Sequence, residues 1–168
     1  MGSTVKVNNI EIWYEEFGDK TNQTVLLIMG ANANCMVWGQ EFIDALIAKD
    51  FHVVRFDNRD VGKSTWFGKE PVINKILKFL PSFILKSLVN SIFGLAVDDK
   101  GKFKFSENTK VQYNLSDMAQ DAVSLMNELQ IKKAHIIGAS MGGMITQLIA
   151  LDHSDKVLSI TPIMTTPG

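Results

Sequence analysis

Hydrophobic and polar positions along the chain follow two kinds of pattern, one typical of buried strands and one typical of helices that cover a sheet. Short runs such as Thr24 to Met29 are apolar at successive positions, as in a strand that a parallel sheet buries on both faces. Between these runs, segments with apolar residues at helical spacing have one side that could pack on such a sheet. The expected strands span residues 10–17, 24–29, 52–57, 134–137 and 157–163, and the expected helices span 41–49, about 116–129 and 141–151.

The order strand, helix, strand repeats along the chain and predicts an α/β fold, with a mostly parallel sheet and helices on both faces. In the first helix, Phe42, Ala45 and Leu46 form the apolar side that should lie on the sheet. Ser116 is the expected N-cap of the second helix. Pro162 either argues against the last expected strand or marks it as an edge strand, because proline cannot donate to a sheet.

One stretch, at about residues 66–105, interrupts this alternation, and we expect an apolar helical insertion within a single domain that spans residues 1–168. Its central part, residues 72–97, is very apolar, yet Lys75 and Lys78 are among several polar residues that recur through it. A membrane span needs ~20 consecutive apolar residues, so the lysines argue against one. We favour a pair of amphipathic helices packed against the domain. The alternative is a lid or surface helix that meets lipophilic ligands or a bilayer.

Composition and charge exclude several classes of protein. A chain of 168 residues with 46% hydrophobic content fits one globular domain. Its 17 basic and 18 acidic side chains give a net charge of −1, so no overall field would attract nucleic acid. The single cysteine, Cys35, excludes an internal disulfide framework. Residues 1–9 lack the apolar core of a secretory signal, so we expect a cytoplasmic protein.

Candidate chemistry centres on Gly138-Ala139-Ser140-Met141-Gly142, a G-x-S-x-G pattern between an expected strand and an expected helix. A serine on so sharp a turn projects its hydroxyl above the sheet, and small flanking residues avoid backbone clashes. The amides that begin the next helix point to the same spot and can stabilise negative charge. This context indicates that Ser140 is a nucleophile. The alternative is that the glycines merely allow close packing of strand and helix.

A second candidate feature is the small-residue loop Met29-Gly30-Ala31-Asn32, at the end of an expected strand. A tetrahedral intermediate needs a second donor besides the amide that follows the nucleophile, and a loop after an earlier parallel strand can supply it. The N–H groups of Ala31 and Met141 are therefore the candidate oxyanion hole. A simple turn at the strand end is the alternative.

The segment Gly62-Lys63-Ser64 matches the tail of a P-loop, which would predict phosphate binding. A true P-loop, however, has glycine at the position that Asp57 occupies, and no second glycine is present to cradle phosphates. A dinucleotide-binding G-x-G-x-x-G pattern is also absent. We therefore do not expect a nucleotide site in this loop.

As a set, these motifs resemble α/β-hydrolase esterases in order and spacing, over nearly the whole chain. The Met-Gly start of the loop after the second expected strand is similar to that of aclacinomycin methylesterase-like hydrolases, as are residues 145–153. The motifs that carry the resemblance are residues 29–32 with Trp38, 57–65, 113–129 and 138–143.

The resemblance implies a truncated α/β-hydrolase fold, with about six of the eight strands of the complete sheet. It also implies that Ser140 attacks a small-molecule ester, apolar if residues 72–97 contribute, and that the amides of Ala31 and Met141 stabilise the oxyanion. The reaction would pass through an acyl-enzyme that water hydrolyses, and no cofactor or metal is implied. The loop at residues 57–65 would brace the active-site region.

In this family the acid and the histidine follow the serine along the chain, on loops after later strands. Residues 165–168 contain no carboxylate, and His52, His135 and His153 are expected at strands or at a helix end, away from Ser140. The chain alone should therefore have little activity. A non-catalytic binding module is the alternative function. A complementing chain or a second copy of this one, paired with the open edge of the last expected strand, is the expected partner.

Overall fold

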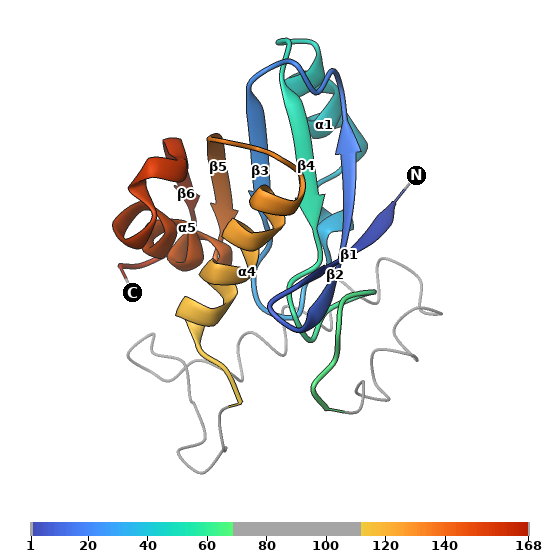
Figure 1. Cartoon of the computed structure of the whole chain (residues 1–168). Helices are drawn as coiled ribbons and strands as arrows, with labels where there is room; N and C mark the ends of the chain where they lie inside the picture. The colour runs from blue at the N-terminus through green and yellow to red at the C-terminus, as the bar shows by residue number, and fades with distance from the viewer. Residues whose placement is uncertain (1, 69–111, 168) are drawn as a thin grey trace, which may run out of the picture. The chain divides into compact units, whose positions relative to one another are not determined.

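A computed structural model of the chain describes residues 2–68 and 112–167. Contacts divide the chain into two units, one made of Met1–Gly68 with Tyr113–Gly168 and the other of Lys69–Gln112. The first unit contains the sheet and the helices that Figure 1 draws in colour.

The apolar insertion expected at residues 66–105 falls almost entirely outside the described residues, and its segment 72–97 does so completely. Its amphipathic helices therefore stay a prediction, as does the single domain spanning residues 1–168. In the part of the chain that the structure describes, no helix is both long enough and apolar enough to cross a membrane.

The core of the first unit is a sheet of six strands in the order β1-β2-β4-β3-β5-β6. Strands β3, β4, β5 and β6 run parallel to one another, while β1 and β2 are antiparallel to their neighbours. The predicted α/β fold with a mostly parallel sheet is therefore confirmed. The strands are β1 (Ser3–Val7), β2 (Ile10–Phe17), β3 (Thr24–Ile28), β4 (His52–Phe56), β5 (Ala134–Ala139) and β6 (Val157–Ile163).

Helices cover both faces of this sheet, as predicted (Figure 1). On one face, α1 (Gln40–Ile47) packs through Ile43 against β3 and β4. On the other face, α4 (Leu115–Glu128) and α5 (Met141–Asp152) contribute to the larger core cluster. The apolar side expected for the first helix is partly wrong, because Phe42 is 37% exposed and Ala45 is also exposed. The buried side of α1 instead centres on Ile43, the residue that follows Phe42 in the sequence.

Asn114, and not Ser116, is the N-cap of α4. The Asn114 side chain accepts a hydrogen bond from the Asp117 N–H at 3.0 Å, and the Asp117 carboxylate accepts one from the Asn114 N–H at 2.7 Å. This reciprocal capping box satisfies two backbone donors at once, which a cap at Ser116 would not. Further along the helix, Met118, Ala122, Val123 and Met126 are buried and belong to the larger core cluster.

The sequence pattern gave no indication of β1, which forms a hairpin with β2. Asn8 and Asn9 join the two strands, and both have positive φ, at 44° and 67°. Two central residues with positive φ suit the turn that best matches the twist of paired strands, and asparagine tolerates this conformation. The apolar alternation of β1 is limited to Val5 and Val7 on either side of Lys6, which is too short to mark a strand in a sequence.

Strand β6 lies at the edge of the described sheet, as Pro162 suggested. Its five central residues are all exposed, including Leu158 and Ile160, which are 42% and 37% exposed. On its paired side, β6 runs in register with β5, and Ala139 lies opposite Ile163. The carboxyl ends of β3, β4, β5 and β6 therefore meet at one edge of the sheet, where parallel sheets carry their binding sites.

Candidate active site

Ser140 occupies the turn between β5 and α5, at the carboxyl edge of the sheet. Its backbone has φ 53° and ψ −120°, a conformation that residues other than glycine rarely adopt and that costs of order 1–3 kcal/mol. The side chain is exposed, and its hydroxyl has no hydrogen-bond partner among residues 2–68 and 112–167. A strained backbone with an unpaired, exposed hydroxyl is the arrangement expected of a serine nucleophile at such a turn.

The glycines beside Ser140 have no room for a side chain. A Cβ at Gly138 would collide with the carbonyl of Gly142 and with the Thr146 hydroxyl, and one at Gly142 would collide with the carbonyl of Ile28. These contacts hold α5 close to both β3 and β5. The glycines thus allow close packing of strand and helix in the same turn that leaves Ser140 exposed.

The loop after β3 reaches Ser140 through Gly30. A Cβ built at Gly30 would lie 3.1 Å from the Ser140 Cβ and 3.2 Å from the Ala139 carbonyl oxygen, so a side chain here would fit only if these neighbours moved by a few tenths of an ångström. The next residue, Ala31, is exposed, and its N–H donates to no acceptor in the described part of the chain; the same is true of the Met141 N–H. Ala31 and Met141, which follow Gly30 and Ser140, therefore each have a backbone N–H without an acceptor in the described part of the chain.

The three histidines of the chain lie far from this serine. His135 is in β5, five residues before Ser140, which corresponds to about 16 Å along a strand. His52 begins β4, level with Thr24 and therefore at the amino end of the parallel strands. His153 follows the last residue of α5, about 18 Å along the helix axis from its first. None of the three imidazoles lies within hydrogen-bonding distance of the Ser140 hydroxyl in this structure.

His52 and His135 are instead held by hydrogen bonds within the sheet. The His52 Nδ1 lies 3.0 Å from the Thr24 hydroxyl, whereas its Nε2 lies 3.3 Å from a Glu16 carboxylate oxygen without forming a hydrogen bond to it. Burial lowers the pKa of His52 through desolvation, although the Glu16 charge opposes the shift. His135 contacts Ser159 at 2.8 Å and Gln23 at 3.1 Å. Both imidazoles therefore have structural partners.

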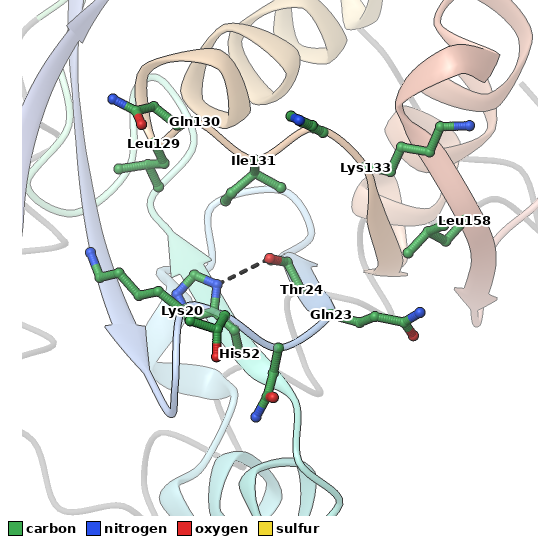
Figure 2. A pocket seen from close by; sticks show the side chains of 12 residues that line it. Lys20, Gln23, Thr24, His52, Leu129, Gln130, Ile131, Lys133 and Leu158 are labelled. Carbon is green, nitrogen blue, oxygen red and sulfur yellow. Dashed lines mark hydrogen bonds between the residues drawn. The ribbon is translucent and has the colours of Figure 1, made fainter.

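A pocket of about 360 Å³ opens at the amino end of the strands, beside His52 (Figure 2). Its lining includes Lys20, Thr24, Ile131 and Leu158. Since Thr24 and Ile28 are the first and last residues of β3, and Ile28 is paired with Gly138, the pocket and Ser140 lie at opposite edges of the sheet. The pocket is not part of the candidate active site.

The loop after β4 braces the loop after β3. Asp57, which is buried, accepts hydrogen bonds from the N–H groups of Cys35 at 2.8 Å and Lys63 at 2.9 Å. Asn58 donates from its side-chain amide to the carbonyl of Met29 at 2.9 Å. Because the Asp57 carboxylate takes up the Lys63 amide, this loop offers no cradle for phosphate. Its bracing role agrees with the expectation from the family resemblance.

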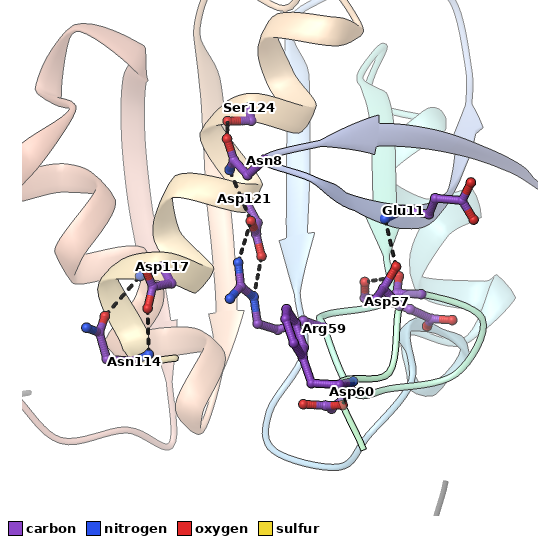
Figure 3. Close-up of polar contacts among 12 residues, drawn as sticks. Asn8, Glu11, Asp57, Arg59, Asp60, Asn114, Asp117, Asp121 and Ser124 are labelled. Carbon is purple, nitrogen blue, oxygen red and sulfur yellow. Dashed lines mark hydrogen bonds and ion pairs between the residues drawn. The ribbon is translucent and has the colours of Figure 1, made fainter. Parts of the chain in front are cut away.

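Arg59 joins the same loop to α4 through a buried ion pair with Asp121 (Figure 3). The Arg59 Nε and Nη2 donate to the two carboxylate oxygens at 2.7 and 2.8 Å, and Asn8 Nδ2 donates to the same carboxylate at 3.1 Å. The guanidinium also lies 5.4 Å from the ring centre of Phe67 and 4.9 Å from that of Tyr113. This cluster fixes the position of the loop that supports the candidate site.

Two further side chains that could act as nucleophiles, Cys35 and Tyr113, have a raised pKa. Burial raises the pKa of the Cys35 thiol, and the nearby Asp57 carboxylate raises it further. Burial and a hydrogen bond with Asp60 raise the pKa of Tyr113 to about 12. Both groups are neutral near pH 7 and therefore poor nucleophiles. Within residues 2–68 and 112–167, no group of three or more His, Cys, Asp or Glu side chains could hold a metal ion.

Two residues beside the candidate site were not singled out from the sequence. Asn58 supports the loop after β3, and Met164 follows the last residue of β6 as Ser140 follows the last residue of β5. Met164 has φ 46° and is 86% exposed. An asparagine after a strand and a methionine before polar residues form no recognisable motif, so their roles depend on the three-dimensional structure.

Comparison with known proteins gives a consistent result. The model of the alpha/beta hydrolase fold family matches residues 23–167. Rhodomycin D methylesterase DauP of Streptomyces sp. (strain C5) is 26% identical over 157 residues, which cover 94% of this chain and 40% of that protein. The chain thus spans less than half the length of this curated relative.

Solved structures give the same fold. A membrane phospholipase A described as a bacterial virulence factor is 25% identical with a TM-score of 0.68, over 99% of this chain and 40% of that one. Epoxide hydrolase A from Mycobacterium thermoresistibile is 18% identical with a TM-score of 0.67, over 96% and 38% of the two chains.

Proposed function

Because the chain belongs to the alpha/beta hydrolase fold family, we propose that it is the nucleophile-bearing part of a serine hydrolase that cleaves a small-molecule carboxylic ester. The observation that carries the proposal is the strained backbone of Ser140, with φ 53°, on a turn between strand and helix. A methylesterase among the relatives supports an ester as the substrate. An apolar ester is our preference, drawn from the composition of residues 72–97.

In the proposed reaction, the Ser140 hydroxyl attacks the ester carbonyl and forms an acyl-enzyme that water then hydrolyses. The N–H groups of Ala31 and Met141 stabilise the negative charge of the tetrahedral intermediate. Their lack of acceptors in the described part of the chain supports this role, as does the contact of Gly30 with Ser140. The helix that begins at Met141 adds the positive end of its dipole.

Ser140, Ala31 and Met141 would supply the nucleophile and the oxyanion hole, but they do not supply a general base. The positions of His52, His135 and His153 leave Ser140 without an imidazole, and loss of triad members costs on the order of 10⁴ to 10⁶ in turnover. We therefore expect this chain, by itself, to acylate slowly. The missing histidine and acid would come from a polypeptide segment that pairs with the edge of β6, either in a second chain or in a longer form of this one.

A second candidate function is a non-catalytic binding or interaction module. The distance between Ser140 and every histidine of the chain favours it, because binding does not require a base. In that case the exposed strand β6, rather than Ser140, would be the important surface.

Labelling with a fluorophosphonate tests the proposal, because this reagent modifies serine nucleophiles covalently. Intact-mass spectrometry of the chain over several hours should show one slow modification that Ser140→Ala removes. Ser154→Ala is the matched control, since Ser154 is also exposed and lies at the start of a short helix; it should label like the parent chain. Equal labelling of the parent and Ser140→Ala would reject Ser140 as the nucleophile.

A further inference from the structure

Ser140 and Met164 are the residues that directly follow two neighbouring parallel strands, β5 and β6. The register of β5 and β6 places Ala139 opposite Ile163 as the last pair, so Ser140 and Met164 leave the sheet from adjacent positions. Adjacent strands are about 5 Å apart, which sets the spacing between the two backbones. The Ser140 N–H donates to the carbonyl of Ile163 at 2.9 Å and fixes this alignment.

The residues after Met164 are held against α5. A Cβ at Gly143 would lie 2.6 Å from the Thr165 methyl group, so glycine permits this close contact. Gln147 donates from its side-chain amide to the carbonyl of Thr166 at 3.1 Å. Met164 is therefore the apex of a turn that is anchored on both sides, by Ile163 and by Thr165 with Thr166.

The backbone of this turn is strained at the same place as the candidate nucleophile. Met164 has φ 46° and Ser140 has φ 53°, so the residues that follow two adjacent strands both have positive φ without being glycine. Such strain tends to collect at functional sites. The Met164 side chain is 86% exposed, at the sheet edge that carries Ser140. An unbranched thioether adapts its shape to varied apolar groups.

We propose that Met164 forms one wall of the space in which the ester meets Ser140, and that it selects substrates with an uncharged, apolar acyl group. This inference rests on the proposed function, because it assigns a specificity to the site that Ser140 would serve. An anionic acyl group would lose water next to the methionine without gaining a partner. A lysine at the same position would reverse that preference.

Acylation of the chain by two aryl esters tests this selectivity. p-Nitrophenyl butyrate and mono-p-nitrophenyl succinate carry acyl groups of the same chain length, one apolar and one anionic. In each case the Ser140 Oγ bonds to the acyl carbon, p-nitrophenolate leaves, and the hydroxyl proton passes to the buffer. Mass spectrometry of the peptide that contains Ser140 gives the rate of butyrylation and of succinylation, and the ratio of the two rates is the readout.

We expect Met164→Lys to lower the butyryl-to-succinyl ratio about tenfold, because the ammonium attracts the succinyl carboxylate. Met164→Leu, which keeps an apolar side chain, should retain the ratio within about threefold. Leu151→Lys is the matched control, since Leu151 is 77% exposed near the far end of α5, and it should leave the ratio unchanged.

A ratio in Met164→Lys equal to that of the parent chain, with Ser140→Ala fully unreactive, would overturn the role of Met164 and leave the proposed function intact. Acylation of Ser140→Ala at the parent rate, or a parent chain that neither ester modifies at Ser140, would overturn both. Thermal melting by circular dichroism establishes that each variant is folded.

Discussion

The Gly142 backbone lies so close to the carbonyl of Ile28 that a single added methyl group would overlap it. The same methyl carbon would lie 2.9 Å from the carbonyl oxygen of Met29. Both obstacles are backbone atoms of β3 and its following loop, so neither can rotate away as a side chain would. The first turn of α5 is thereby held against the strand that leads to the candidate oxyanion loop.

Gly142→Ala should therefore destabilise the fold by about 1–3 kcal/mol, the usual cost of overpacking a core. Urea unfolding followed by circular dichroism measures the change. Gly68→Ala is the control, because no atom of residues 2–68 and 112–167 lies within 4 Å of a Cβ there, and its free energy of unfolding should stay near that of the parent. A Gly142→Ala variant as stable as Gly68→Ala would show that α5 can shift away from β3 at little cost.

The buried pair of Arg59 and Asp121 yields a second prediction. Asp121→Ala leaves the guanidinium without its carboxylate inside the protein, which should cost about 3–5 kcal/mol in unfolding free energy. Lys20→Ala removes a partner from an exposed pair with Glu16 and should cost at most about 1 kcal/mol. The double variant Arg59→Met with Asp121→Leu should be more stable than Asp121→Ala, because no unpaired charge remains buried. The opposite order would contradict this account of the pair.

The buried imidazole of His52 predicts how stability depends on pH. Its pKa in the folded protein is lowered, mainly by desolvation, whereas in the unfolded chain it is about 6.5. Below pH ~6.5 the unfolded state takes up a proton that the folded state resists, so the contribution of His52 to stability is present above that pH and is lost as the pH falls.

The free energy of unfolding should therefore rise between pH 5 and pH 7, and His52→Gln should reduce that rise. Urea titrations at pH 5, 6 and 7 measure both slopes, so a uniform loss of stability in the variant does not obscure the result. An unchanged slope in His52→Gln would mean that other groups dominate the pH dependence.

The sequence predicted the turn at Ser140 because its requirements are local. Two glycines around a serine, placed between an apolar run and a helical pattern, are sufficient to recognise it. Its exact length was less predictable, since Gly138 and Ala139 belong to β5 although their small side chains suggested the turn. Pairing with Ile28 and Ile163 draws them into the sheet, and that pairing joins distant parts of the chain.

Features that depend on distant contacts were missed for the same reason. Arg59 and Asp121 are separated by 62 positions, so no local pattern connects them. The cap of α4, in contrast, is a local feature: Ser116 was expected from its residue type alone, whereas Asn114 is the cap because Asp117 completes a capping box with it. The alignment of Met164 with Ser140 required the register of two strands.

The central claim, that the hydroxyl of Ser140 is the nucleophile, is tested most directly by finding which atom a fluorophosphonate modifies. The parent chain is labelled to completion and digested, and tandem mass spectrometry then locates the phosphonate within its peptide. We predict that the modification lies on Ser140 alone, in the peptide that joins β5 to α5. A phosphonate on any other side chain, with Ser140 unmodified, would contradict the proposed hydrolase.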